Sequence, residues 1–449
     1  MPLSRFQKFK MQKSTFTEGL CLFLIAMMFI SKISLKWTGV VPRSIPPLIF
    51  QHGLHPYINF GINFLGGFIL FFIYFRKKHR PSVSKTYKFL IFSMLAILSI
   101  QTLFQIAMVN ITYSMTMQLG GLIMAIAVTA IYGIFIPALL PLDRMVHFTK
   151  RFAVTLVFIS LILLPVLSPY MFRGGRFIGV FKHIPHMVSA STFAFIFFLP
   201  SVFNYRSFTW KKNNILNILA LILIFFAVIL TATKAALITC LISVGGAILI
   251  YGSKKKSVRM FKFFFIGSIL TFLVTVGPSV ANFAYDVATG QKGFGMRPAQ
   301  DGIESRMEEI HRGWGLFQES PAFGKGILYK FMNAEGVDVQ GYNSFKDPHN
   351  LFVSAGVIAG WPFLIFSVFA YLAMIAGTLR GLASHSLNQQ MMALFLLSHL
   401  PVFLIYHVHL SLGGLGDRMY WLVFGYLALN LPQKSPVTHR NQEMVPALT

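Results

Sequence analysis

Residues 214–251 read NILNILALILIFFAVILTATKAALITCLISVGGAILIY. This stretch is about twice as long as the roughly 20 apolar residues that a helix needs to cross a membrane. The segment TATK at residues 231–234 interrupts the apolar run with two threonines and a positive charge. The stretch therefore predicts two consecutive membrane spans with a break near Lys234.

The composition of the whole chain extends this prediction. Of its 449 residues, 55% are hydrophobic and 12% are charged, which leaves too little polar surface for a soluble domain of this size. We therefore expect an all-α, polytopic integral membrane protein that forms a single domain over residues 1–449. The apolar runs predict about twelve transmembrane helices, at residues 17–35, 57–75, 89–109, 119–142, 152–171, 187–204, 214–233, 235–251, 261–283, 350–379, 389–410 and 414–432.

The net charge of +26 follows a pattern along the chain. Lysine and arginine are concentrated at the N-terminus and in the even-numbered connections, as in RKKHRPSVSK (76–85) and KKKSVR (254–259). Cytoplasmic loops of membrane proteins carry such an excess, so we expect both termini and the even-numbered connections in the cytoplasm. The charges punctuate apolar segments and form no nucleic-acid-binding module, so no nucleic-acid partner is expected.

Several positive charges break this rule because they fall on the outward side of the expected topology. Topology does not explain them, and they could line an external cavity that binds an anion. They are Arg173, Arg176 and Lys182 in the fifth connection, Lys234 at the seventh, Arg297, Arg306 and Arg312 in the ninth, and Arg418 in the last span.

The ninth connection, at residues 284–349, is the one long loop that we expect, and it holds nine of the thirteen acidic residues. We predict that its centre, at residues 302–321, forms an amphipathic helix that ends at Ser320-Pro321. Such a helix could lie on the outer membrane surface above the bundle. The apolar residues that recur at helical spacing are Ile303, Met307, Ile310, Trp314 and Phe317.

Two basic residues are candidates for binding phosphate. Arg306 lies at one edge of the apolar face, where it either snorkels to water, pairs with Glu309, or points its guanidinium at an anion. Lys234 either snorkels to the interface or remains as a cation at a helix break, where the dipole of the next helix also attracts anions. The sequence leaves these alternatives open.

A histidine stands where the tenth span begins, in the segment DPHN at residues 347–350. His349 is either an interfacial polar residue or a general base, since a neutral imidazole near pH 7 can accept a proton. Asp347 is close enough in sequence to orient it. Asp347 or a neighbour could also cap the helix, with Pro348 in its first turn.

Motifs for other chemistry are missing from the sequence. It has no Walker A loop, no G-x-G-x-x-G, no G-x-S-x-G and no HExxH. His183 and His186 are close together, but no cysteine or carboxylate stands at a spacing that would complete a metal site. We predict neither a metal nor a cofactor. If the protein transfers a group from a phosphate-bearing donor, we expect arginine and lysine to bind that phosphate.

The chain resembles the O-antigen ligase / O-antigen polymerase superfamily, most strongly from about residue 173 to 432. The amphipathic helix of the ninth connection is one shared feature. The segments that carry the rest of the resemblance are IPH (184–186), TATKAA (231–236), SPAFGKG (320–326), PHN (348–350) and GVIAGW (356–361).

This resemblance implies a metal-independent glycosyltransferase of lipopolysaccharide synthesis in the inner membrane of a Gram-negative bacterium, with its site open to the periplasm. The most similar members, the O-antigen ligases, transfer O-antigen polysaccharide from undecaprenyl pyrophosphate to lipid A-core. The implied partners are therefore the undecaprenyl-pyrophosphate-linked glycan donor, the lipid A-core acceptor and membrane lipids.

The resemblance also implies roles for particular residues. His349 is the general base that deprotonates the acceptor hydroxyl. Arg306 and Lys234 bind and stabilise the pyrophosphate leaving group. Arg173, Arg176 or both correspond to further basic residues of the donor site.

The chain departs from the family at two of these places. Members usually carry arginine at the position of Lys234, and lysine keeps the charge but lacks the bidentate geometry of a guanidinium. Many ligases have a second histidine where this chain has Asp347-Pro348, so a mechanism with two histidines does not transfer.

Two alternatives to a ligase remain. A polymerase of the same superfamily would join one lipid-linked repeat to another and would use the same donor. A transporter for lipid-linked saccharide would also need a cationic cavity. It would not need a histidine at the outer face, and it would favour inverted repeats or charges at the middle of the membrane.

Overall fold

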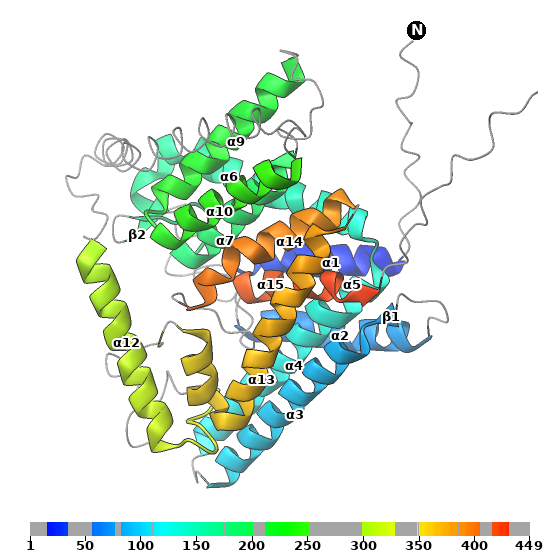
Figure 1. Cartoon of the computed structure of the whole chain (residues 1–449), viewed down its shortest axis with the longest axis vertical. Coiled ribbons are helices and arrows are strands. Elements are labelled where there is room, and N and C mark those ends of the chain that lie inside the picture. The colour runs from blue at the N-terminus through cyan, green and yellow to red at the C-terminus, as the bar shows by residue number, and fades with distance from the viewer. Residues whose placement is uncertain are drawn as a thin grey trace, which may run out of the picture.

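The computed structural model describes residues 16–34, 56–76, 82–108, 112–173, 176–200, 212–251, 299–327, 348, 350–384, 386–404 and 415–430. Over these residues the chain is mostly helical and its strands are only two residues long, in agreement with the all-α prediction (Figure 1). The elements are α1 (Phe16–Ile30), α2 (Pro56–Arg76), β1 (Ser82–Val83), α3 (Lys85–Met108), α4 (Thr112–Ala130), η2 (Ile131–Phe135), α5 (Ile136–Leu139), α6 (Leu142–Met171), β2 (Phe172–Arg173), β3 (Arg176–Phe177), α7 (Ile184–Phe198), α9 (Lys212–Leu230), α10 (Lys234–Tyr251), α12 (Ala299–Glu319), α13 (Leu351–Leu382), α14 (Leu387–His399), η4 (Pro401–Leu404), α15 (Leu415–Leu427) and β4 (Leu429–Asn430).

The predicted membrane spans are confirmed in part. Within the described ranges, six helical segments are long and apolar enough to cross a membrane, and four further apolar helices are shorter. The span predicted at residues 261–283 lies outside the described residues. The six segments are Ile58–Arg76, Lys85–Ala107, Gln118–Leu139, Leu142–Val166, Leu351–Leu382 and Leu387–Leu404.

Burial separates helices on the outside of the bundle from those in its centre. In α2, 28% of the span is buried, against 72% in the span that α4, η2 and α5 form together. Phe64, Phe68 and Phe75 on α2 are all more than half exposed. Exposed aromatic side chains in such number are expected where lipid covers the protein surface.

The central span contains a turn of π-helix, η2, that fixes its neighbours. The carbonyl oxygen of Gly133 accepts a hydrogen bond from the hydroxyl of Tyr87 at 2.9 Å, and the Tyr132 hydroxyl donates to the carbonyl of Leu24 at 2.9 Å. A Cβ atom on Gly425 would lie 2.4 Å from the Gly133 carbonyl oxygen. Only glycine permits this approach, so α15 packs directly on the backbone of η2.

Contacts between connections sort them into two ends of the bundle. At one end, β1 pairs with β4, with Ser82 opposite Asn430, and Arg144 forms an ion pair with Glu18. These residues come from the N-terminal and C-terminal segments and from even-numbered connections. The sequence places all of them on one side of the membrane.

The other end joins odd-numbered connections. Ile33, which α1 separates from Glu18, forms an antiparallel bridge with Phe181. The side-chain amide of Asn350 donates to the carbonyl of Leu404 at 3.0 Å. The two groups of contacts agree with the predicted alternation of even and odd connections.

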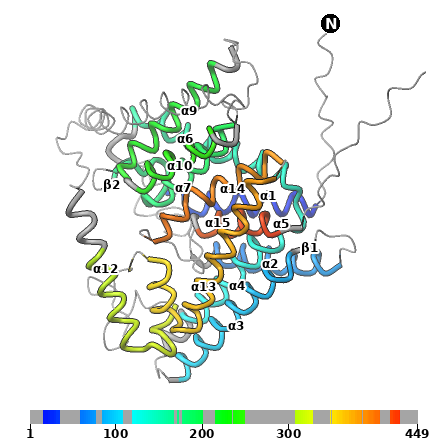
Figure 2. Tube along the Cα trace, viewed as in Figure 1, coloured from blue at the N-terminus to red at the C-terminus, as the bar shows by residue number. Residues whose placement is uncertain are grey.

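Helix α13 departs from the single continuous span predicted at residues 350–379. Ala359 (φ −146°, ψ 27°) and Gly360 (φ 72°, ψ −169°) are not helical. The backbone therefore breaks between residues 351–358 and 361–382, and Figure 2 shows the change of direction between the two parts. The short first part is buried along most of its length.

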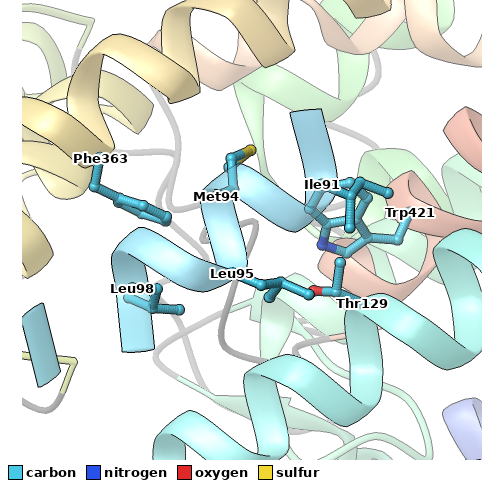
Figure 3. Close-up of a pocket in the computed structure, with 7 residues that line it drawn as sticks. All are labelled: Ile91, Met94, Leu95, Leu98, Thr129, Phe363 and Trp421. Atoms are coloured by element: carbon cyan, nitrogen blue, oxygen red, sulfur yellow. The ribbon is translucent and has the colours of Figure 1, made fainter. Parts of the chain in front are cut away.

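A small pocket lies between α3, α4, α13 and α15 (Figure 3). Its lining is apolar apart from one threonine, so it offers no group for acid-base chemistry and we do not regard it as the functional site. The lining residues are Ile91, Met94, Leu95, Leu98, Thr129, Phe363 and Trp421.

Candidate functional site

Helix α12, which carries Arg306, confirms the helix predicted in the ninth connection (Figure 1). Its buried face is rotated from the predicted one. Leu316 and Phe317 are 5% and 1% exposed, whereas Met307 and Trp314 of the predicted apolar face are 46% and 40% exposed. The prediction was therefore wrong in detail, because the packing partner of the helix decides which apolar residues it buries.

Gly313 of α12 lies close to Pro348 and to the first turn of α13. A Cβ atom on Gly313 would lie 2.4 Å from the Cβ of Pro348 and 3.0 Å from Cγ1 of Val353. One turn further along α12, the ring of Phe317 lies with its centroid 5.0 Å from that of Trp361. Helix α12 thus packs on the start of α13 and on the residue that follows its break.

The turn that follows α12, at residues 320–327, fills the break in α13. The broken helix leaves the carbonyl groups of Val357 and Ile358 without helical partners. They accept hydrogen bonds from the N–H groups of Lys325 at 2.6 Å and Gly326 at 3.0 Å. The segment SPAFGKG, which the resemblance singled out, therefore caps the end of a helix.

Gly360 completes this arrangement from the side of α13. A Cβ atom on it would lie 2.4 Å from the carbonyl oxygen of Ala322, and its φ of 72° favours glycine. The N–H of Trp361 donates to the carbonyl of Pro321 at 2.8 Å. The position of α12 is thereby fixed by backbone contacts at both of its neighbours, the turn and α13.

His349 lies outside the described residues, but the residues on either side of it are placed. Pro348 is buried against Gly313 of α12. Asn350 is the N-cap of α13. The structure thus packs the helix that carries Arg306 against Pro348, which precedes His349 in the sequence.

The sequence predicted that Asp347 or a neighbouring residue caps this helix, and the structure shows that the cap is Asn350. Its Oδ1 accepts hydrogen bonds from the N–H groups of Phe352 at 2.9 Å and Val353 at 3.0 Å. Pro348 precedes the helix, so the prediction that it lies in the first turn was wrong. Asp347 lies outside the described residues.

The break predicted near Lys234 is confirmed, since α10 begins at this residue. The turn before it is buried, and Ala232 is the one non-glycine residue with positive φ (48°) within the described ranges. The Thr231 hydroxyl donates to the carbonyl of Val228 at 2.6 Å, and the Thr233 hydroxyl donates to that of Thr231 at 3.1 Å. Lys234 therefore stands at a helix N-terminus, where the helix dipole attracts anions.

Arg173 and Arg176 face each other in register across the β2–β3 pair. Arg176 is half-buried. The described atoms do not include the side chains of Arg173, Lys234 and Arg306, so their roles as phosphate ligands stay predictions.

The structure also brings together three cations that the sequence did not predict to lie close to one another. Lys32, Lys182 and Arg418 come from three distant segments, and Lys32 was not among the outward cations identified from the sequence. Burial, then repulsion from Arg418 and from Lys182, lowers the pKa of Lys32 well below its usual value, and the negative charge of Asp417 opposes this shift. Lys32 lies two residues after the end of α1 but inside the span predicted at residues 17–35, and a charged residue within an apolar run is the signal that could have found it.

Metal ligands are sparse in the part of the chain that the structure describes. The ring centroids of His183 and His186 are 6.2 Å apart. Over these residues no group of three or more histidine, cysteine, aspartate or glutamate side chains could hold a metal ion.

A known protein family matches the middle of the chain. Residues 219–368 match the family model described as O-Antigen ligase. Over this segment the chain is similar to the O-antigen ligase superfamily. The matching segment spans about a third of the chain and includes Lys234, Arg306 and His349, but not Arg173 or Arg176.

The search among curated proteins gave no match. The family match and the apolar helices together indicate a bacterial multi-pass membrane protein of the O-antigen ligase or polymerase type. The resemblance predicted from the short segments is thereby confirmed.

Proposed function

We propose that this O-antigen ligase superfamily member transfers O-antigen polysaccharide from undecaprenyl pyrophosphate to lipid A-core. The observation that carries the proposal is the packing of α12 on Pro348, one residue before His349, within the segment that matches the family. This packing supports a site that combines a base with an arginine-bearing helix.

In the proposed reaction, His349 accepts the proton of the acceptor hydroxyl. The hydroxyl oxygen then forms a bond to the anomeric carbon of the donor sugar, while the bond between that carbon and the pyrophosphate oxygen breaks. The proton that His349 holds leaves to solvent or to the released undecaprenyl pyrophosphate. A positioned general base of this kind contributes about 10²–10⁴-fold to the rate.

The leaving pyrophosphate gains negative charge as the bond breaks, so positive groups in place beforehand stabilise the transition state. We assign this role to Arg306 and Lys234, with Arg173 and Arg176 as further donor ligands. Arg306 precedes Gly313 by two helical turns, so its Cα lies on the face of α12 that packs on α13. Lys234 adds the N-terminal dipole of α10.

The proposal places the odd-numbered connections in the periplasm and both termini in the cytoplasm. It rests on the excess of lysine and arginine in the even-numbered connections and on the sorting of contacts into two ends. Helix α12, within the proposed periplasmic loop at 284–349, would then cover the site and exclude water, which limits hydrolysis of the donor.

The decisive experiment supplies the purified protein, reconstituted in lipid bilayers without added metal, with a defined glycan donor and lipid A-core. We expect glycan-bearing lipid A-core as the product. Extension of the donor glycan without transfer to core would identify a polymerase instead. Movement of the intact donor across the bilayer without either product would identify a transporter.

A further inference from the structure

A group of cations, in which Arg418 is buried and Lys32 and Lys182 are half-buried, lies where two odd-numbered connections meet the start of α15. The N–H of Lys182 donates to the carbonyl of Lys32 at 3.0 Å, beside the bridge between Ile33 and Phe181. Arg418, on the first turns of α15, repels the charges of both Lys32 and His186. Segments from the start, middle and end of the chain therefore bring positive charge to one place.

Arg418 is the least satisfied member of this group. Its side chain is 0% exposed, and its Nε and Nη1 have no hydrogen-bond partner among the described residues. Its other contacts are weak, with Nη2 at 3.5 Å from Oδ1 of Asn59 and the guanidinium carbon 5.7 Å from the ring centroid of Tyr132. A buried guanidinium is costly unless its N–H groups meet acceptors, so this geometry favours an anionic ligand.

The local charge balance agrees with this reading. Asp417 contributes one negative charge that acts on Lys32, against the three positive charges of Lys32, Lys182 and Arg418. Burial also lowers the pKa of Lys182. Among the described residues of this group, the basic side chains therefore outnumber the acidic one, which suits an anionic ligand.

We propose that Lys32, Lys182 and Arg418 bind the phosphate group of a membrane lipid. This inference depends on the proposed function in one respect, which is the side of the membrane on which the site lies. Lys32 follows α1, Lys182 precedes α7 and Arg418 lies near the start of α15. The ends of membrane-spanning helices lie near the lipid headgroups, so a phosphate bound there would belong to a lipid headgroup. Two sources share this chemistry, the diphosphate of the donor lipid and the phosphates of the acceptor lipid.

The test measures binding, not transfer, so that it stands apart from the test of the proposed function. Wild-type protein and the variants Lys32→Gln and Lys182→Gln, each in nanodiscs of neutral lipid, are titrated with two probes. One probe is a polyprenyl diphosphate without glycan, and the other is lipid A-core with or without its phosphates. Lys88→Gln is the matched control, because Lys88 is a partly buried lysine at the opposite end of the bundle, beside β1.

Each site variant is expected to bind one probe about tenfold more weakly, as for loss of one charged hydrogen bond, and the control to bind as wild type does. A loss confined to the polyprenyl diphosphate assigns the site to the donor. A loss confined to phosphorylated lipid A-core, and absent with the dephosphorylated form, assigns it to the acceptor.

Arg418→Gln is expected to show the larger loss, with partial recovery in Arg418→Lys, provided that both retain the thermal stability of the wild type. If Arg418→Gln does not fold, the two lysine variants decide the question alone. Unchanged affinity for both probes in Lys32→Gln and Lys182→Gln would overturn the proposal, whatever the transfer activity of the protein.

Discussion

Two regions of the molecule treat their buried hydrogen-bonding groups in opposite ways. At the break in α13, the backbone groups of residues 357–361 bond to the turn at 320–327. In the group formed by Lys32, Lys182 and Arg418, a fully buried guanidinium keeps two nitrogens without partners among the described residues. The first region pairs its backbone N–H and carbonyl groups internally and so holds the fold, whereas we propose that the unpaired guanidinium nitrogens of the second bind a ligand.

The turn is also held by side chains from α3. The Nε2 of Gln105 donates to the carbonyl of Phe323 at 2.6 Å, and that of Gln101 to the carbonyl of Ala322 at 3.3 Å. The ring of Phe323 stacks on that of Phe104, with the centroids 3.9 Å apart. Changes in this region should therefore affect stability first, and changes in the cationic regions should affect ligand binding and turnover first.

Substitution of His349 should give the largest effect. Its neighbours Pro348 and Asn350 have structural contacts, whereas the imidazole of His349 is proposed to take part in the reaction. We expect His349→Ala to lower the transfer rate about 10²–10⁴-fold with an unchanged melting temperature. The rate with defined donor and lipid A-core measures the effect. His311→Ala is the control, because His311 is exposed on α12; near-normal turnover of His349→Ala would remove this residue from the mechanism.

Arg306 sharpens the comparison on the same helix. We expect Arg306→Ala to lower kcat/KM for the donor about 10- to 100-fold, as for loss of a charged hydrogen bond worth about 1.5–3 kcal/mol. The acceptor KM should change little. Arg312→Ala is the control, because the structure places Arg312 at an exposed position of α12 and we do not assign it to the donor site. Equal effects of the two substitutions would contradict a phosphate role for Arg306.

Gly360 tests the region that holds the fold. Gly360→Ala places a Cβ 2.4 Å from the carbonyl oxygen of Ala322 at a φ of 72°, and we expect a loss of about 1–3 kcal/mol of stability from the strained backbone. Thermal unfolding in detergent measures it. Gly315→Ala is the control, because a Cβ on this helical glycine meets nothing within 4 Å. An unchanged melting temperature for Gly360→Ala would show that the break tolerates a side chain.

The pH dependence of lipid binding gives the smallest effect, a few-fold in affinity. The pKa of Lys32 is lowered in the free protein, and a bound phosphate would raise it, so binding takes up a proton and weakens as the pH rises between the two values. A titration at alkaline pH avoids ionisation of His186, because burial and neighbouring positive charges lower its pKa. Burial also lowers the pKa of Lys182, and both proteins compared below retain this residue.

Lys32→Arg isolates the contribution of this residue, since a guanidinium stays charged throughout the range. We expect the variant to bind the phosphate lipid with a flatter pH profile than the wild type. The same slope in both proteins would exclude Lys32 as the titrating group.

Some features followed from the sequence alone because they depend on neighbouring residues. The apolar run at 214–251 and its interruption at TATK predicted two helices and the start of α10 at Lys234. The helical spacing of apolar residues predicted α12. Short-range chemistry, apolar length and periodicity, fixes such elements without reference to the rest of the chain.

Other features were decided only by the tertiary structure. The continuous span expected at 350–379 is broken because the turn at 320–327 supplies the hydrogen bonds that the helix loses. The buried face of α12 depends on how closely Gly313 approaches Pro348. The cations Lys32, Lys182 and Arg418 meet because two connections and the start of α15 fold together, and a pattern read along the chain carries no information about such distant encounters.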